Sequence, residues 1–307
     1  MTIHVVNGQD VYYAGVQDMK VWYNPSLKTN KTSILQANVR SVNYQNIAAY
    51  SSKGATIELP LSSHDKKEDN IGYADLAVGL NADNSSNGTM KVSTVMMAFS
   101  YALPLNYDNT YLAAGFQGAY TFSQVALTDY YLLPNHFDQY GAFGSALSSD
   151  PYQSGFEYDY FTAGVGIAVF HTGTEKQWYM GGSIRHVNQP YTEWTHNAKL
   201  AMNNGIQAGY SASITNEDAL GGYAFLNWQA AVHEQVIGAL YTRNLDDSSR
   251  YDFSLGLGFR VGDALIPNVG LKFGDSRIAF YYEFVFPGNS GNSYNRTAFE
   301  FSYSLVL

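Results

Sequence analysis

Histidine and serine side chains near the ends of apolar segments could form a hydrolytic site, because a histidine that accepts a serine proton activates the hydroxyl as a nucleophile. His171, His186 and His233 occupy such positions, and Ser183 stands close to His186 in the sequence. A site of this kind would suit an outer-membrane phospholipase. Histidines at strand ends also act as amphipathic anchors at a membrane surface. We favour the anchoring role, so no catalytic residue is predicted.

Two oxygen-rich stretches suggest other chemistry. Asp246 and Asp247 could form the acid pair of a protease, but their surroundings, NLDDSS, are typical of a turn. The stretch from Asn81 to Gly88, NADNSSNG, offers oxygen ligands but lacks the bidentate acid that completes a calcium loop. The chain has no cysteine, which excludes disulfides and thiolate metal sites. The sequence therefore predicts no metal and no cofactor.

The composition indicates a surface that does not face water alone. Charged residues make up 14% of the chain, against roughly 25% in soluble domains. Aromatic residues reach 15%, and there are 28 glycines. The mean hydropathy is nevertheless -0.21, so the apolar residues must be dispersed among polar ones, as in transmembrane β-barrels. The net charge of -9 argues against nucleic acid as a partner.

The final stretch, RTAFEFSYSLVL, alternates between large apolar residues and residues that are mostly small or polar. This period of two predicts a strand with two unlike faces. One face carries Phe299, Phe301, Tyr303, Leu305 and Leu307. Because an exposed apolar edge invites aggregation, we expect this strand to pair with the first one, so that the sheet closes and lipid covers the aromatic face.

Alternating segments of this kind, separated by polar turn clusters, run along the chain. Their predicted ranges are 32–42, 53–62, 71–82, 91–105, 109–124, 158–172, 177–187, 204–215, 222–231, 234–244, 251–260, 267–274, 276–286 and 297–307. A membrane helix over 109–128 is the alternative for the longest uncharged stretch, but Gln117 and Thr121 lie inside it and its large residues alternate. We predict an all-β fold, a closed antiparallel transmembrane β-barrel of about 14 strands, an even number as in single-chain bacterial barrels.

The alternation also assigns the two faces of each strand. In the first strand Val39 should meet lipid, whereas Asn38 and Arg40 face the lumen. Nearly all charged residues within strands fall on the lumenal face, which fits a wet interior. These residues include Arg40, Glu58, Asp75, Arg185 and Glu300. Gly164 and Gly166 are also lumenal, and their small size leaves interior room for bulkier neighbours.

Aromatic residues near the predicted strand ends suit the interfacial girdles of a membrane barrel. They are Trp22, Tyr101, Tyr107, Trp178, Tyr179, Trp228, Tyr241, Tyr281 and Tyr282. We expect these rings to mark the two levels at which the barrel meets the headgroups.

Connection lengths predict the orientation of the barrel. Residues 1–31 form an amino-terminal periplasmic or plug-like segment, and residues 32–307 form the barrel. The odd-numbered connections include the longest, above all residues 125–157, whereas the even-numbered ones are short. Short turns face the periplasm in outer-membrane barrels, so we expect both termini to be periplasmic. The first residues lack a basic region followed by an apolar one, so we expect this numbering to start from a processed or recombinant end.

The predicted long extracellular loop, 125–157, is rich in large apolar side chains. They are Tyr130, Tyr131, Leu132, Leu133, Phe137, Tyr140, Phe143, Tyr152 and Phe156. So many apolar groups in a surface loop need burial. Either the loop folds into the lumen as a plug, or it offers an apolar patch to a partner protein.

Short motifs resemble the type IX secretion system membrane protein family (PorP/SprF) of Bacteroidota. Near the start, the family's tyrosine-rich opening and Asn-Pro motif are matched by Tyr23, Asn24 and Pro25, and its first strand ends in an arginine matched by Arg40. Ser26 replaces the family's alanine. The midsection WYMGGSIRHVNQP resembles a pattern matched by Gly181, Ser183, His186, Asn188 and Pro190. In the closing strand, Glu300 stands between apolar neighbours as in the family.

The resemblance implies a non-enzymatic protein in the outer membrane of a Gram-negative, Bacteroidota-like bacterium. Members serve the export and surface attachment of specific large adhesins, including gliding adhesins, whose C-terminal domain they receive. The implied partners are outer-membrane lipid, that C-terminal domain and the periplasmic ring lipoproteins of the secretion and gliding machinery. The alternative function is an outer-membrane diffusion channel or a hydrophobic-substrate transport channel.

Overall fold

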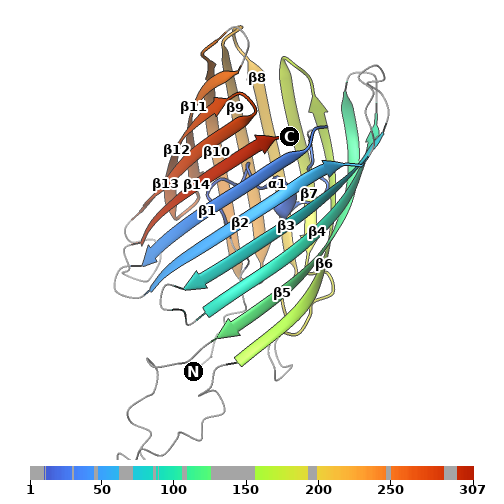
Figure 1. Cartoon of the computed structure of the whole chain (residues 1–307), viewed down its shortest axis with the longest axis vertical. Helices are drawn as coiled ribbons and strands as arrows, with labels where there is room; N and C mark the ends of the chain where they lie inside the picture. Colours follow the sequence, from blue (N-terminus) through green and yellow to red (C-terminus); the bar gives the residue numbers. More distant parts are fainter. Residues whose placement is uncertain are drawn as a thin grey trace, which may run out of the picture.

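Antiparallel strands form a closed barrel in the computed structural model (Figure 1). The structure describes residues 10, 12–29, 31–44, 48–61, 72–85, 88, 90–105, 109–125, 156–192, 199–246, 250–286 and 296–307. The strands are β1 (Ile34–Tyr44), β2 (Ala48–Pro60), β3 (Tyr73–Ser85), β4 (Met90–Pro104), β5 (Thr110–Val125), β6 (Phe156–Thr172), β7 (Lys176–Arg185), β8 (Asn203–Ser213), β9 (Asp218–Gln229), β10 (Val232–Asn244), β11 (Tyr251–Arg260), β12 (Ala264–Phe273), β13 (Ser276–Val285) and β14 (Arg296–Val306). The predicted fold class and strand number are confirmed, since the ring runs from β1 to β14.

The closing seam joins the first and last strands over their full length. Val39 lies opposite Phe301, and Arg40 lies opposite Glu300, in the antiparallel register of β1 and β14. The backbone N–H of Leu307 donates a hydrogen bond of 2.9 Å to the carbonyl of Ser33. The final strand therefore has no free edge, which removes the aggregation hazard that its apolar face would otherwise create.

The side chains alternate between an apolar outer face and a buried inner face, as predicted. In β14, Phe299 and Phe301 are 48% and 45% exposed, whereas Ala298, Glu300 and Ser302 are buried. The same alternation runs through the other strands, so the outer surface of the barrel is an apolar band. Among the described residues, no helix is long and apolar enough to cross a membrane.

The predicted boundaries of the longest connection, 125 and 157, are wrong at both ends, because β5 extends to Val125 and β6 starts before residue 158. β6 begins at Phe156, which pairs with Val125 at the end of β5. Next to this pair, Gln124 donates a side-chain hydrogen bond of 2.8 Å to Glu157. Phe156 is therefore a strand residue, because the ladder continues beyond the point where the alternation weakens. The other apolar residues proposed for a plug or a partner contact lie outside the described residues: Tyr130, Tyr131, Leu132, Leu133, Phe137, Tyr140, Phe143 and Tyr152.

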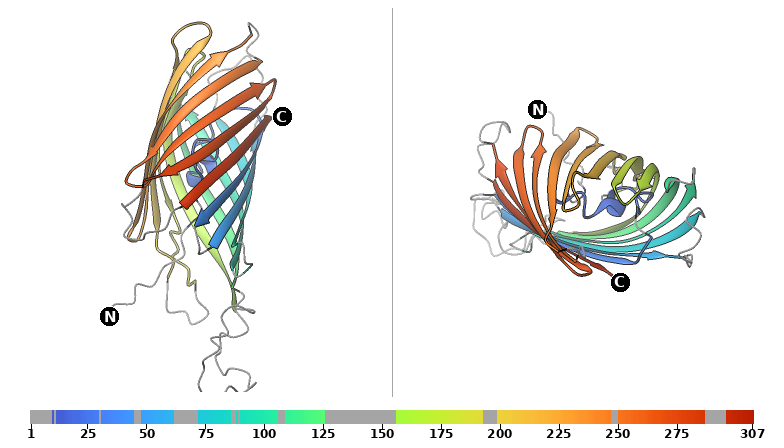
Figure 2. Two further views of the ribbon diagram at one scale, coloured as in Figure 1. Left: turned by 90° about the vertical axis from the view of Figure 1, so that its left-hand side faces the viewer. Right: turned by 90° about the horizontal axis from the view of Figure 1, so that it is seen from above.

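The amino-terminal segment, residues 10 and 12–29, lies inside the barrel (Figure 2, right). It contains the short helix α1 (Lys20–Tyr23), which ends where Asn24 adopts an extended backbone. Pro25 causes this end, because the residue before a proline is disfavoured in the helical conformation. Beyond Asn24 the chain leads to β1.

Apolar side chains of this segment form a cluster that we call the lumenal core. On the segment its members are Tyr13, Val16, Met19, Val21, Trp22 and Tyr23, and on the strands Ala77, Met96, Ala98, Ala119, Tyr223, Phe225 and Val236. The ring centroids of Tyr23 and Phe225 are 4.9 Å apart. Burial of these side chains is the main favourable contribution to holding the segment in place.

Three residues assigned to the interfacial girdles lie in the lumen instead, and Tyr107 lies outside the described residues. Tyr179 faces inward, with its ring centroid 4.8 Å from Nζ of Lys20. Trp22 is a buried member of the lumenal core. Tyr281 is also buried, and its hydroxyl donates a hydrogen bond of 2.6 Å to Asp18. The prediction was wrong because an occupied interior needs aromatic side chains as much as the membrane interface does.

The connections differ between the two ends of the barrel. At the end where β14 terminates, β6 and β7 are joined by residues 173–175, and β12 and β13 by residues 274–275. Gly274 has φ 61° in that tight turn, a conformation that favours glycine. At the opposite end the β5–β6 connection, residues 126–155, is the longest. The connection between β1 and β2 is also at this end. It is much shorter than the predicted 43–52, since β1 ends at Tyr44 and β2 begins at Ala48.

Candidate functional site: the lumen and the segment within it

Inward-facing glycines provide the space in which the Asn24–Pro25 motif sits. A Cβ atom on Gly115 of β5 would lie 2.7 Å from the carbonyl carbon of Pro25. A Cβ atom on Gly181 of β7 would lie 2.8 Å from the side-chain nitrogen of Asn24, and one on Gly166 of β6 would collide with the oxygen of the same amide. Three adjacent strands therefore carry glycine where the motif touches the wall.

The same motif forms hydrogen bonds with the midsection motif on β7. The side chain of Asn24 donates a hydrogen bond of 3.2 Å to the carbonyl of Gly182, and Ser183 Oγ donates one of 2.8 Å to the carbonyl of Tyr23. Asn24 Oδ1 accepts hydrogen bonds from the backbone N–H and hydroxyl of Ser26, at 3.0 and 2.7 Å. Two motifs that are far apart in the sequence thus form one contact.

His186 is part of a charged cluster and is not paired with serine. Its Nε2 lies 2.8 Å from Asp10 Oδ2, and Arg185 Nη1 lies 3.2 Å from the same oxygen. The side-chain nitrogen of Asn203 donates a hydrogen bond of 2.7 Å to the same oxygen. Burial would raise the pKa of Asp10, but the neighbouring His186 and Arg185 hold the pKa well below its ordinary value. The hydrolytic Ser183–His186 pairing is not formed.

The last two residues of the midsection motif stabilise the rim of the barrel. His186 has φ 57°, and this left-handed residue ends β7. Beyond it, the Asn188 side chain donates a hydrogen bond of 2.8 Å to the carbonyl of Phe161 and accepts one of 3.0 Å from the N–H of Ala163. Its amide therefore pairs with β6 as the backbone of a neighbouring strand would. The carbonyl of Pro190 accepts a hydrogen bond of 2.8 Å from Leu200.

Glu300 joins the closing strand to the amino-terminal segment. It accepts hydrogen bonds from the backbone N–H groups of Ala14 and Gly15, at 2.5 and 3.2 Å, and from the Asn38 side chain at 2.7 Å. Glu300 is fully buried. A carboxylate that accepts several such bonds in a buried site makes stronger contacts than a neutral acceptor.

Arg40 belongs to a buried ion network on the wall at the seam. It forms an ion pair of 2.6 Å with Glu283 and donates to the carbonyl of Tyr12. Glu283 also lies 2.9 Å from Arg260 and 2.8 Å from Arg296. Such networks are costly to break, because removing one partner leaves an unpaired buried charge.

Further polar contacts attach the segment to other parts of the wall. Lys28 pairs with Asp75 of β3 at 2.6 Å, and Asp18 pairs with Arg277 of β13 at 2.8 Å. The hydroxyl of Tyr13 donates to Asn81 of β3 at 2.6 Å. The segment is therefore held by contacts to strands from both halves of the chain.

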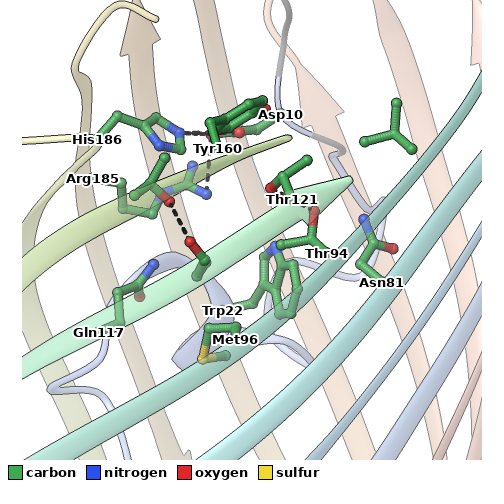
Figure 3. Close-up of a pocket in the computed structure, with 13 residues that line it drawn as sticks. Asp10, Trp22, Asn81, Thr94, Met96, Gln117, Thr121, Tyr160, Arg185 and His186 are labelled. Carbon is green, nitrogen blue, oxygen red and sulfur yellow. Dashed lines mark hydrogen bonds and ion pairs between the residues drawn. The ribbon is translucent and has the colours of Figure 1, made fainter. Parts of the chain in front are cut away.

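A cavity of about 60 Å³ lies beside the segment, toward the end with the longest connection (Figure 3). Its lining includes the Asp10–His186–Arg185 cluster, Trp22 and Gln117. A larger cavity of about 140 Å³, which we call the vestibule, is lined by Gln17, Lys20, Thr29, Gln177 and other residues. Residues of the segment line both cavities together with residues of the strands. Neither cavity alone is a passage through the barrel.

His171 and Asp246, two residues considered for catalysis in the sequence, have partners in the structure, and Asp247 lies outside the described residues. His171 Nδ1 contacts Thr110 Oγ1 at 3.1 Å, and its ring stacks on Trp178. Asp246 accepts hydrogen bonds from the N–H groups of Arg250 and Tyr251, as in a turn. In the part of the chain that the structure describes, no group of three histidines or acids could hold a metal ion.

A closed barrel with an apolar outer band and a charged interior is the architecture of an outer-membrane β-barrel protein. The family model "Type IX secretion system membrane protein PorP/SprF" matches residues 5–305. The chain therefore belongs to this family, and it is an outer-membrane barrel of the type IX secretion system. No match is found among the curated proteins.

Solved structures of other outer-membrane barrels share the fold. The "TodX deltaS2S3 mutant monoaromatic hydrocarbon channel" is 10% identical with a TM-score of 0.55, and the match covers 96% of this chain and 95% of that one. The Pseudomonas putida toluene transporter TodX is 9% identical with a TM-score of 0.51, over 97% and 95% of the two chains. At this identity the likeness concerns the fold alone.

All ten residues chosen from the family motifs lie at or near the lumen or its rim. The residues that sequence reasoning missed lie on the amino-terminal segment and contact the wall or line a cavity, mainly Asp10, Tyr13, Asp18 and Lys20. One signal was available, namely the inward-facing glycines. Several of them lie against the amino-terminal segment: Gly54, Gly79, Gly115, Gly166 and Gly181.

Proposed function

We propose that this chain is a non-enzymatic barrel that binds, helps to export or anchors a specific large surface adhesin through the adhesin's C-terminal domain. Membership of the PorP/SprF family supports the link to type IX secretion. The observation that carries the choice of an anchor over a pore is the occupied lumen. Residues 10 and 12–29 occupy it through the lumenal core and through contacts to β1, β3, β7, β13 and β14.

We propose that the carboxyl terminus is periplasmic and that the longest connection is extracellular. The short connections at the end where β14 terminates support this orientation, because periplasmic turns are short in such barrels. The predicted periplasmic entry of the amino-terminal segment does not fit this arrangement, because Asp10 contacts His186 at the end of β7, on the side of the longest connection. From there the segment leads to the opposite end, where β1 begins. Residues 126–155 then present their apolar side chains to a partner at the cell surface, and the periplasmic ring lipoproteins meet the opposite end.

A binding experiment tests the anchor. The full chain in detergent is mixed with the purified C-terminal domain of the adhesin whose gene lies next to its own, and with the C-terminal domain of an unrelated secreted protein. We expect the neighbouring domain to be retained and the unrelated one to be washed away. Equal retention of both domains, or of neither, would contradict a role in handling a specific cargo.

The alternative function is a diffusion channel or a hydrophobic-substrate channel. Its support is the presence of cavities at two levels of the lumen, of about 60 and 140 Å³. A channel would require the amino-terminal segment to move, because its buried contacts separate these spaces. A saturable uptake of small solutes into vesicles that contain the intact chain would favour this function over the anchor.

A further inference from the structure

The vestibule lies at the end of the barrel where β14 terminates. Its lining includes Thr172 and Gln177, which flank the β6–β7 turn, and Ser211 near the β8–β9 turn. Gln177 and Ser211 face inward by the alternation of their strands, yet both are exposed. Solvent therefore reaches the vestibule from this mouth. Its volume of about 140 Å³ is close to that of the roughly 150 Å³ cavity that admits benzene in a protein core.

Lys20 supplies a positive charge to the lining of the vestibule. Its Nζ lies 4.8 Å from the ring centroid of Tyr179 and 3.4 Å from the hydroxyl of Thr29. Gly209 permits this arrangement, because a Cβ atom there would lie 2.6 Å from Cζ of Tyr179. The aromatic face and the hydroxyl hold the ammonium in place without neutralising its charge.

Lys20 differs from Lys28, Arg277 and Arg40, three other cations that contact the segment or the seam. Lys28 has Asp75 at 2.6 Å, Arg277 has Asp18 at 2.8 Å, and Arg40 has a carboxylate at 2.6 Å. Among the described residues, no carboxylate comes within the 4.0 Å of an ion pair with Lys20, although Glu58 and Asp18 act on it from farther away. Burial lowers the pKa of Lys20, as expected for an ammonium that lacks a close counter-ion.

We propose that the vestibule is a carboxylate-binding site in which Lys20 is the counter-ion and Thr29, Gln17 and Gln177 offer further hydrogen-bonding groups. The site fits a monoanion. A single ammonium stands among neutral amides and hydroxyls, whereas phosphate is typically held by arginine clusters or several backbone N–H groups. The carboxylate enters from the mouth described above. Its source is either an acidic group of an exported protein or a small free carboxylate.

Nuclear magnetic resonance on the intact chain in detergent tests the site. Lysines are dimethylated with ¹³C, which keeps their charge, and Lys20→Met identifies the Lys20 signal. The protein is then titrated with sodium acetate. In a control titration, acetamide is added together with sodium chloride at the same ionic strength. We expect a saturable shift of the Lys20 signal with acetate only. Lys199, whose Nζ lies 5.2 Å from the ring centroid of Tyr191 outside the vestibule, is the matched lysine that should not move.

Two results would overturn the proposal: no saturable shift at Lys20, or equal shifts at Lys20 and Lys199. Because this measurement uses the unsubstituted lysine, it remains decisive if Lys20→Met folds poorly, and Lys199→Met or Lys20→Arg spectra then complete the assignment by elimination. The site does not rest on the adhesin proposal, since acetate is the probe.

A second measurement distinguishes the two sources. Retention of the adhesin's C-terminal domain is compared between Lys20→Met and Lys199→Met. A loss confined to Lys20→Met supports a carboxylate supplied by the exported protein. Unchanged retention together with the acetate shift supports a small free carboxylate.

Discussion

The side-chain nitrogen of Asn24 donates a hydrogen bond of 3.2 Å to the backbone carbonyl of Gly182, across 158 positions of sequence. This bond joins the amino-terminal motif to the midsection motif inside the barrel. The carbonyl of Gly182 belongs to the strand that also supplies Ser183, whose hydroxyl donates to Tyr23. The two motifs are therefore the two sides of one docking contact, and substitutions in either should weaken the same structure.

The close approach of Pro25 to β5 predicts the effect of Gly115→Ala. The added methyl group would meet the backbone of Pro25 at 2.7 Å, and a backbone cannot swing aside as a flexible side chain can. We expect a loss of about 1–3 kcal/mol of unfolding free energy, the usual cost of overpacking, and faster proteolysis of the segment. Urea unfolding of the barrel in lipid vesicles measures the first quantity.

Gly182→Ala is the matched control for this substitution. Gly182 has a backbone oxygen as its nearest neighbour, at 3.8 Å from a Cβ atom, so an alanine fits there. A destabilisation by Gly182→Ala as large as that by Gly115→Ala would show that the contact with Pro25 is not the cause.

The strands could be predicted from the sequence because each has an outer and an inner face. In β14, alternation alone placed Phe299 outside and Glu300 inside, and the burial of Glu300 confirms it. The first residues of the chain have no such period. Tyr13, Met19 and Trp22 contact different strands of the wall from a segment without regular secondary structure around most of its length. Their positions could therefore not be predicted from their spacing in the sequence.

The motif residues illustrate the same limit. Asn24 followed by Pro25 is typical of a turn, and Asn24 does form a side-chain turn with Ser26. Turn chemistry nevertheless does not say what the turn touches. The glycines that receive it, such as Gly166, were predicted only to leave room for bulkier neighbours, and the structure shows that the neighbour is Asn24.

Glu300→Gln tests the attachment of the closing strand to the segment. Glutamine keeps the shape but loses the charge that strengthens the bonds from Ala14 and Gly15, at 2.5 and 3.2 Å. Hydrogen bonds to charged groups contribute about 1.5–3 kcal/mol each, so we expect a loss of about 1–3 kcal/mol of unfolding free energy. Glu157→Gln, at an exposed position bonded to Gln124, should change the stability little. Equal effects of the two substitutions would argue against the attachment.

Arg260→Met tests the ion network at the seam. Arg260 lies 2.9 Å from both Glu234 and Glu283, and all three side chains are buried. Removing the arginine leaves two carboxylates short of a partner, and we expect a loss of about 3–5 kcal/mol. Arg243→Met on the neighbouring β10 removes an exposed pair with Glu217, which contributes little. A stability of Arg260→Met equal to that of Arg243→Met would contradict a structural role for the network.

The pKa of Asp10 predicts how docking responds to acid. His186 and Arg185 hold this pKa below its ordinary value of 3.8, so the stabilisation is complete above that value and is lost as the pH falls below about 4. Melting temperatures of the wild type and Asp10→Asn should therefore differ by a constant amount from pH 7 to 5. The difference should shrink in stronger acid. A difference that grows on acidification would have the wrong sign for this account.

The central claim is that residues 10 and 12–29 occupy the lumen of the intact barrel. Single-channel recording in planar bilayers tests it most directly, with the full chain beside a variant that lacks residues 1–29. The account predicts no steady current from the full chain and a steady current from any shortened barrel that inserts. A large, steady current from the full chain would contradict it.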